Sequence, residues 1–242
     1  LHVFEKVAEC VDCNRYPSYE KVYYSRKQFK KAKGTEIGEN ILLDLFSKNG
    51  FTIISPEQLT LDEQIAVVRN TKLLCGIIGT LGHNMLFAKP EQHMILVNKT
   101  HNINVAQMDI NKMKNLDMTY IDSYLAEFPS LIGNGPFLIT YSEMLNQYVE
   151  KHNWKKPAED VISETVLKRN LQEYEEMYRS RNLKNLRLIY EKNPDRFDYF
   201  APDHLLELEM RFYHLEHPAT MREKIFYQYN RVKRAFRRIV KR

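Results

Sequence analysis

Residues 72–84 read KLLCGIIGTLGHN, and this stretch decides the fold class. Its first half, 72–78, is a short apolar run, which is typical of a strand in a parallel sheet that is covered on both faces. Its second half opens with Gly79, a residue that permits a tight turn, and predicts a short helix that runs to Phe87. We therefore expect a buried strand that turns into a helix at its carboxyl end.

Strands and helices alternate outward from this stretch. Further strands are predicted at 21–25, 51–54 and 94–97, with helices at 39–48 and from Thr60 onward. Such alternation with short loops implies right-handed crossovers and a parallel sheet. The predicted fold class is therefore α/β, a Rossmann-like parallel sheet with flanking helices.

The helix that starts after Thr60 has a clear amino-terminal signal. Thr60 and Glu63 have the spacing of a capping box, in which each side chain bonds the other residue's backbone N–H. The buried side of this helix is predicted to carry Leu61, Ile65, Ala66 and Val68.

The character of the chain changes near Pro157. Beyond it the sequence predicts helices and no further strand, with breaks at Asn193-Pro194 and His217-Pro218. We therefore predict two parts, a sheet domain over 1–157 and an all-α, basic tail over 158–242.

Composition excludes several classes of protein. Hydrophobic residues make up 43% and charged residues 28% of the chain, which permits a core and argues against disorder. No run reaches the length of a membrane-spanning helix, and the first residues lack a signal-peptide pattern. Cys10 and Cys13 form a C-x-x-C pair without two further ligands at zinc spacing, so we predict no metal site.

Positive charge gathers at the end of the chain. The net charge is +5, and residues 222–242 contain nine Lys or Arg and one Glu. Apolar residues recur there at helical spacing, so 221–242 predicts a basic amphipathic helix. Such a helix can lie on an anionic membrane surface or dock on protein, and both alternatives stay open. No motif that reads nucleic acid is present, so no specific nucleic-acid partner is predicted.

Polar residues follow two of the predicted strands. Ser25 and Arg26 end the first strand, and the turn 79–84 ends the third. Parallel sheets bind ligands at the carboxyl ends of their strands. A guanidinium can hold a phosphate with two hydrogen bonds, and a glycine turn that opens a helix can offer it backbone N–H groups. The alternatives are a solvated arginine and a simple tight turn.

Three further side chains near these turns each allow two interpretations. Glu39 can accept a hydrogen bond from a sugar hydroxyl, or complement the dipole of the helix that it opens. His83 can donate to a phosphate or transfer a proton, or be structural. Asn84 can bind a ligand or cap the helix.

Three segments, taken in order, resemble glycosyltransferase family 61 of the capsular polysaccharide biosynthesis type. YYSR at 23–26 is similar to the family's strand that ends in Ser-Arg. Residues 38–51, GENILLDLFSKNGF, are similar to its Asn-Glu helix and the Lys-Arg-Gly-Phe that follows. Residues 61–87 are similar to its Gln-Ile helix, apolar strand, glycine turn and Asn-x-x-Phe.

The chain departs from the family pattern at three places. Gly38 stands where the family has Asn, and Ile77 and Ile78 stand where its turn has Pro and His. His83, five residues later, is the candidate substitute for that histidine. Thr80-Leu81-Gly82 stands where the turn has Ala-Gly-Leu.

The resemblance implies the carboxyl-terminal, donor-binding lobe of a two-lobed, GT-B-type, inverting glycosyltransferase that needs neither metal nor cofactor. Residues 1–157 would hold the nucleotide-sugar donor, and His83 and Glu39 are the catalytic candidates. The donor-binding candidates are Ser25, Arg26, Gly79, Thr80, Gly82 and Asn84.

The same resemblance sets the expected partners. The acceptor would be a glycan or lipid-linked glycan, and the product a cell-surface or capsular polysaccharide precursor. We expect the acceptor lobe outside these 242 residues, so whether this fragment acts alone stays open. The alternatives are a non-catalytic nucleotide-sugar-binding or assembly module and a nucleotide-binding enzyme of another class. The expected location is the cytoplasm, including the inner face of the membrane.

Overall fold

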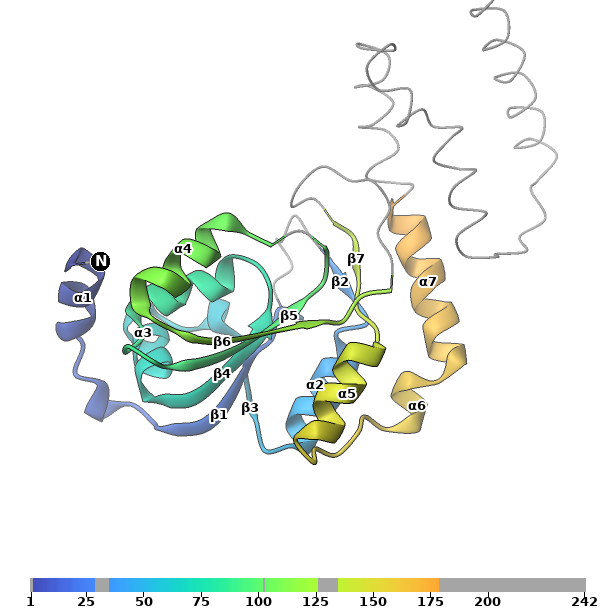
Figure 1. Ribbon diagram of the computed structural model, residues 1–242, viewed down its shortest axis with the longest axis horizontal. Helices are drawn as coiled ribbons and strands as arrows, with labels where there is room; N and C mark the ends of the chain where they lie inside the picture. The colour runs from blue at the N-terminus through green and yellow to red at the C-terminus, as the bar shows by residue number, and fades with distance from the viewer. Residues whose placement is uncertain (1, 29–34, 102, 126–134, 179–242) are drawn as a thin grey trace, which may run out of the picture. The chain divides into compact units, whose positions relative to one another are not determined.

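The computed structural model describes residues 2–28, 35–101, 103–125 and 135–178 (Figure 1). The chain divides into two compact units. One comprises Leu1–Glu127 and Ile132–Met177, and the other comprises Phe128–Leu131 and Tyr178–Arg242. Apart from Tyr178, the second unit lies outside the described residues, and so does the amphipathic helix predicted over 221–242. The domain boundary predicted at residue 157 stays a prediction.

Five parallel strands form the main sheet, in the order β3-β1-β4-β5-β6. They are β1 (Tyr19–Tyr24), β3 (Thr52–Ile54), β4 (Thr71–Ile77), β5 (His93–Asn98) and β6 (Asp117–Asp122). This confirms the predicted α/β class. The strand order changes direction between β1 and β4, and open α/β sheets bind ligands outside the carboxyl ends of the strands at such a point.

Helices connect the strands and extend beyond them. They are α1 (His2–Glu9), η1 (Cys13–Arg15), α2 (Asn40–Lys48), η2 (Pro56–Gln58), α3 (Leu61–Asn70), η3 (Thr80–Phe87), α4 (Val105–Lys114), α5 (Glu143–Lys151), α6 (Glu159–Ile162) and α7 (Glu164–Tyr178). The helix predicted after Gly79 is a 3₁₀ helix, η3. None of the helices in the described ranges combines the length and apolarity needed to cross a bilayer.

The capping box predicted at the start of α3 is present. The Thr60 hydroxyl accepts a hydrogen bond from the Glu63 N–H at 3.3 Å, and the Glu63 carboxylate accepts one from the Thr60 N–H at 2.7 Å. Leu61, however, is 55% exposed, so its predicted burial is wrong. Ile65, Ala66 and Val68 are buried as predicted. Leu61 is the first residue of the helix and lies before the segment that packs on the sheet.

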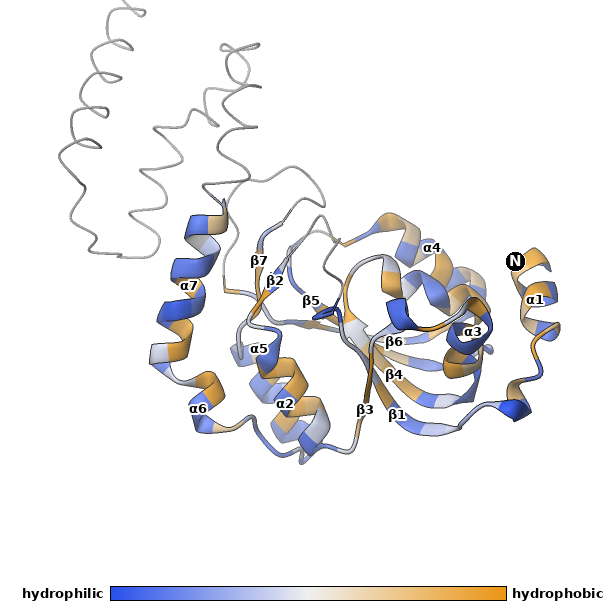
Figure 2. Cartoon of the chain, turned by 180° about the vertical axis from the view of Figure 1, so that it is seen from behind, coloured by the Kyte–Doolittle hydropathy of each residue, from blue (hydrophilic) through white to orange (hydrophobic). Residues whose placement is uncertain are grey.

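Both faces of the sheet are covered, because successive strand residues alternate between two cores. On one face Tyr23, Ile95 and Val97 pack with buried residues of α2 and α5. On the other face Val22 and Leu96 pack with buried residues of α3, η3 and α4. Figure 2 shows that α2 carries both apolar and polar residues, as a helix that covers one face of a sheet must.

A second, two-stranded parallel sheet pairs β2 (Glu36–Ile37) with β7 (Phe137–Leu138). The sequence did not predict it, because two residues are too short to show a periodicity. Gly38 follows β2 with a φ of +86°, and a Cβ at this position would lie 2.3 Å from the Ile139 carbonyl oxygen. The close approach of β7 therefore requires glycine where the family pattern has Asn.

Candidate functional site

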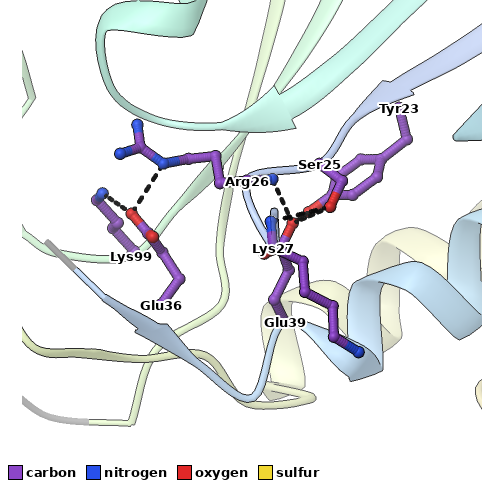
Figure 3. Close-up of polar contacts among 7 residues, drawn as sticks. All are labelled: Tyr23, Ser25, Arg26, Lys27, Glu36, Glu39 and Lys99. Carbon is purple, nitrogen blue, oxygen red and sulfur yellow. Dashed lines mark hydrogen bonds and ion pairs between the residues drawn. The ribbon is translucent and has the colours of Figure 1, made fainter. Parts of the chain in front are cut away.

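A cluster of polar side chains lies at the carboxyl ends of β1 and β5, and we call it the edge cluster. It consists of Tyr23, Ser25, Arg26, Lys27, Glu36, Glu39 and Lys99 (Figure 3). Three local features position its members. β1 leads directly into Ser25 and Arg26, β5 leads directly into Lys99, and β2 presents Glu36.

Glu39 is the acceptor at the centre of one half of the edge cluster. Its Oε1 accepts hydrogen bonds from the Tyr23 hydroxyl at 3.1 Å, the Ser25 hydroxyl at 3.0 Å and the Arg26 backbone N–H at 2.9 Å. Glu39 is 4% exposed and immediately precedes α2, yet its side chain makes no cap to that helix. The carboxylate therefore fixes the end of β1.

The buried environment around Glu39 shifts the pKa values of Glu39 and Tyr23. Burial raises the pKa of the Glu39 carboxyl above its usual value, and hydrogen bonds from Arg26, Ser25 and Tyr23 partly oppose that rise. Burial, followed by the charge of Glu39, also raises the pKa of the Tyr23 phenol. Tyr23 therefore stays protonated and acts as a donor to the carboxylate at neutral pH.

Glu36 forms the other half of the edge cluster, where two cations approach one carboxylate oxygen. Its Oε1 lies 3.2 Å from Arg26 Nε and 2.5 Å from Lys99 Nζ. The three side chains are only 4% to 11% exposed. Burial lowers the pKa of the Lys99 ammonium, while the charge of Glu36 opposes that fall. The Lys99 Nζ also lies 4.1 Å from the centre of the Phe137 ring on β7.

Arg26 and Gly79 come together at the switch point between β1 and β4. Gly79 follows β4, and a Cβ built on it would lie 3.1 Å from Arg26 Nη1. The two predicted stretches, one after each strand, therefore converge at the same edge of the sheet. A side chain in place of Gly79 would crowd the guanidinium.

The remaining predicted residues of the turn contact the helices beside it. Thr80 is exposed at the start of η3. His83 Nε2 lies 3.2 Å from Asn104 Nδ2 at the cap of α4, and burial lowers the pKa of this histidine. The Asn84 amide donates to Gln64 of α3 at 3.0 Å. Neither bond involves a member of the edge cluster.

Gly82 is a packing position in the same turn. It is buried, and a Cβ on it would lie 2.4 Å from the Gln107 Oε1 of α4. The absence of a side chain here therefore lets α4 approach η3.

Sequence reasoning missed Glu36 and Lys99. Glu36 carries no local signal, because β2 has only two residues. Lys99 could have been found from the sequence, because it is a lysine two residues after the apolar strand predicted at 94–97. The carboxyl end of such a strand is where parallel sheets bind ligands. Within the part of the chain that the structure describes, no three His, Cys, Asp or Glu side chains gather to hold a metal ion.

A surface pocket of about 600 Å³ lies at the opposite edge, at the amino ends of β1, β4 and β5. Arg69 and Lys72 are among its lining residues, and Lys72 pairs with Glu20 in an ion pair whose side chains are about three-quarters exposed. The pocket contains none of the predicted site residues.

Fold and site together define a Rossmann-like α/β protein with a largely buried, charged cluster at the strand ends where such sheets bind ligands. Residues 2–95 match the family described as Glycosyltransferase 61. This match confirms, over these residues, the resemblance to family 61 that was stated from the sequence. The match includes Arg26, Glu36, Glu39 and the whole of η3, and it stops before Lys99. No curated protein and no solved structure matches the chain.

Proposed function

We propose that this chain binds the nucleotide-sugar donor of an inverting, metal-independent transferase that extends a cell-surface or capsular polysaccharide precursor. The family match over residues 2–95 supports glycosyl transfer in general. The observation that carries the donor assignment is the convergence of Arg26 and Gly79 at the switch point of the sheet.

The chemistry of the donor explains why this arrangement suits it. When the sugar leaves, the nucleoside diphosphate gains negative charge, and a fixed cation beside it stabilises the transition state. Arg26 supplies that cation. The backbone after Gly79 can approach the phosphates closely because no Cβ intervenes. Ser25 adds a hydroxyl, which would exchange its hydrogen bond to Glu39 Oε1, at 3.0 Å, for one to the donor.

The other predicted residues have supporting roles in this proposal. Gly82 and Asn84 hold the turn in place beside α4 and α3. Thr80, which is exposed at the start of η3, is assigned to the donor. Glu39 Oε1 fixes Ser25 and Arg26, and no donor among the described residues reaches its Oε2, which we assign to a hydroxyl of the donor. His83 is kept neutral by its lowered pKa, a state that suits proton transfer.

The acceptor and the location belong to the same proposal. A glycan or lipid-linked glycan would be the acceptor, and the basic segment 221–242 would hold the enzyme at the inner face of an anionic membrane.

Calorimetric titration of the 242-residue chain with a panel of nucleoside diphosphates tests donor binding. We expect at least one nucleoside diphosphate to bind. Arg26→Ala should weaken that binding by about 30-fold or more, because the bound diphosphate loses the guanidinium that pairs with it. Arg69→Ala is the matched control, since Arg69 lies at the opposite edge of the sheet. Equal binding by wild type and Arg26→Ala, with both folded by thermal melting, would exclude Arg26 from the donor site.

Transfer of a labelled sugar by the natural full-length protein separates an enzyme from a non-catalytic binding module. We expect transfer to a glycan acceptor. Binding of a nucleotide sugar without transfer or hydrolysis would favour the module.

A further inference from the structure

Two lysines of the described residues are buried, Lys114 at 4% and Lys99 at 7% exposure, and Lys99 is the one at the sheet edge where such folds bind ligands. It directly follows β5, the neighbour of β4. A lysine buried for structure alone is rare, since desolvating an ammonium group is costly. Its place beside Arg26 and Glu36 therefore calls for a further explanation.

The charges in the edge cluster are arranged unevenly. Arg26 Nε and Lys99 Nζ lie within ion-pair distance of the same oxygen of Glu36, at 3.2 and 2.5 Å. The second carboxylate, Glu39, is engaged by two hydroxyls and a backbone N–H, none of which carries a charge. One carboxylate oxygen thus serves two cations, in the way that a phosphate oxygen would (Figure 3).

We propose that Lys99 and Arg26 form a two-cation clamp for the donor's diphosphate, and that Glu36 is a built-in counter-ion standing where a phosphate oxygen binds. The clamp rests on the proposed donor-binding function. The diphosphate competes with Glu36 for the two cations. The centre of the Phe137 ring lies 4.1 Å from Lys99 Nζ and stabilises the ammonium group when the diphosphate displaces the Glu36 carboxylate.

Two substitutions then have opposite effects. Lys99→Met removes one cation of the clamp and should weaken nucleoside diphosphate binding by about 30-fold or more. Glu36→Gln removes the competing negative charge and should tighten binding by about tenfold or more, because a like charge beside a phosphate opposes it. If Lys99 and Glu36 only stabilised the fold, both substitutions would lower the melting temperature. They would not change the affinity for nucleoside diphosphates in opposite directions.

The experiment is calorimetric titration of the 242-residue chain with UDP, GDP, CDP and inorganic pyrophosphate. Lys72→Met is the matched control, because Lys72 also forms an ion pair with a glutamate but is exposed. The double variant Lys99→Met with Glu36→Gln removes both charges of this ion pair, so Glu36 is not left as a buried carboxylate without Lys99. This variant should still bind nucleoside diphosphates weakly, because Lys99 is absent.

The outcomes separate this inference from the proposed function. If the wild-type chain binds none of the four probes, the donor-binding proposal itself fails. If it binds a nucleoside diphosphate and both Lys99→Met and the double variant bind equally well, the clamp is overturned while donor binding stands. If Glu36→Gln binds no more tightly than wild type, Glu36 is not a competing counter-ion.

Discussion

Two stretches reach the same edge of the sheet, and their polar groups behave differently. After β1, Ser25 and Arg26 contact the carboxylates Glu39 and Glu36 in a largely buried network. After β4, His83 and Asn84 of the turn 79–84 contact the helices beside it, while Thr80 is exposed. Gly79 lies beside Arg26. Polar residues after a strand are thus not equivalent: in the first stretch they join a largely buried network, and in the second they contact helices or solvent.

The largest effect is expected where the network after β1 is broken. Glu39→Ala should lower the free energy of unfolding by about 3 kcal/mol or more, because three buried donors lose their acceptor. Urea unfolding can be followed by the fluorescence of Trp154, the only tryptophan, whose ring centre lies 5.4 Å from that of Phe51. Glu150→Ala, an exposed carboxylate, is the control and should change little. Equal losses for both variants would refute the central role of Glu39.

A smaller effect is expected at the packing position of the turn. Gly82→Ala should destabilise the chain by about 2 kcal/mol, because the new Cβ would collide with the Gln107 amide. Gly50→Ala is the control, since Gly50 has a φ of +78° but open space around it and should cost only about 1 kcal/mol of backbone strain. Unchanged unfolding together with lost nucleotide binding in Gly82→Ala would instead place the ligand against Gly82.

A substitution of Asn84 tests whether this side chain contacts α3 or the donor. Asn84→Ala should cost about 1 kcal/mol or less, because it removes one partly buried hydrogen bond, to Gln64. Nucleoside diphosphate binding, measured by calorimetry, should stay within about twofold of wild type, since the side chain is directed to α3. A much larger loss of binding would mean that the Asn84 amide leaves Gln64 to contact the donor, and the contrast between the two stretches would fail.

The pH dependence of stability tests how Glu39 acts in the network after β1. Because burial raises its pKa above 4.5, the folded chain holds this proton more tightly than the unfolded chain. The resulting stabilisation is complete below pH 4.5 and is lost as the pH rises through the folded-state pKa. The free energy of unfolding of wild type, relative to Glu39→Gln, should therefore fall as the pH rises from 4.5. A difference that grows with pH would show that the hydrogen bonds outweigh burial.

The smallest effect is expected at His83, which is only partly buried. Burial lowers its pKa below 6.5, so the folded chain binds this proton less tightly than the unfolded chain. Its contribution is present above pH 6.5 and lost as the pH falls through the folded-state pKa. NMR titration, with the signal assigned by comparison with His83→Gln, should give a pKa below 6.5. A value above 6.5 would indicate an anionic neighbour.

The main sheet and its helices were predictable because their signals are local. The apolar run at 72–78 corresponds to β4, and the capping box at Thr60 marks the start of α3. The helix after Gly79 was expected, although its 3₁₀ form was not. The strands β2 and β7 were missed, because a two-residue strand is defined only by its pairing with a partner 101 residues away.

The candidate site was predictable in part for the same reason. Ser25, Arg26 and Gly79 stand beside predicted strand ends, and they do converge. Glu39, which opens a predicted helix, joins them. Glu36 and Lys99 were missed, since their ion pair joins residues that are 63 positions apart. His83 and Asn84 are in the predicted turn, but the helices beside them decided where their side chains go.

By itself, the sequence determined the parallel α/β fold, the family resemblance and the strand ends at which polar residues gather. Apolar periodicity, capping residues and glycine turns act over a few residues, so they can be read along the chain. Only the tertiary structure decided which charges meet, that two cations share one oxygen of Glu36, and that the polar side chains of the turn after Gly79 contact helices. The physical reason is that burial and ion pairing depend on distances in space, and these are set when β2 pairs with β7, β4 pairs with β1 and β5, and α4 packs on η3.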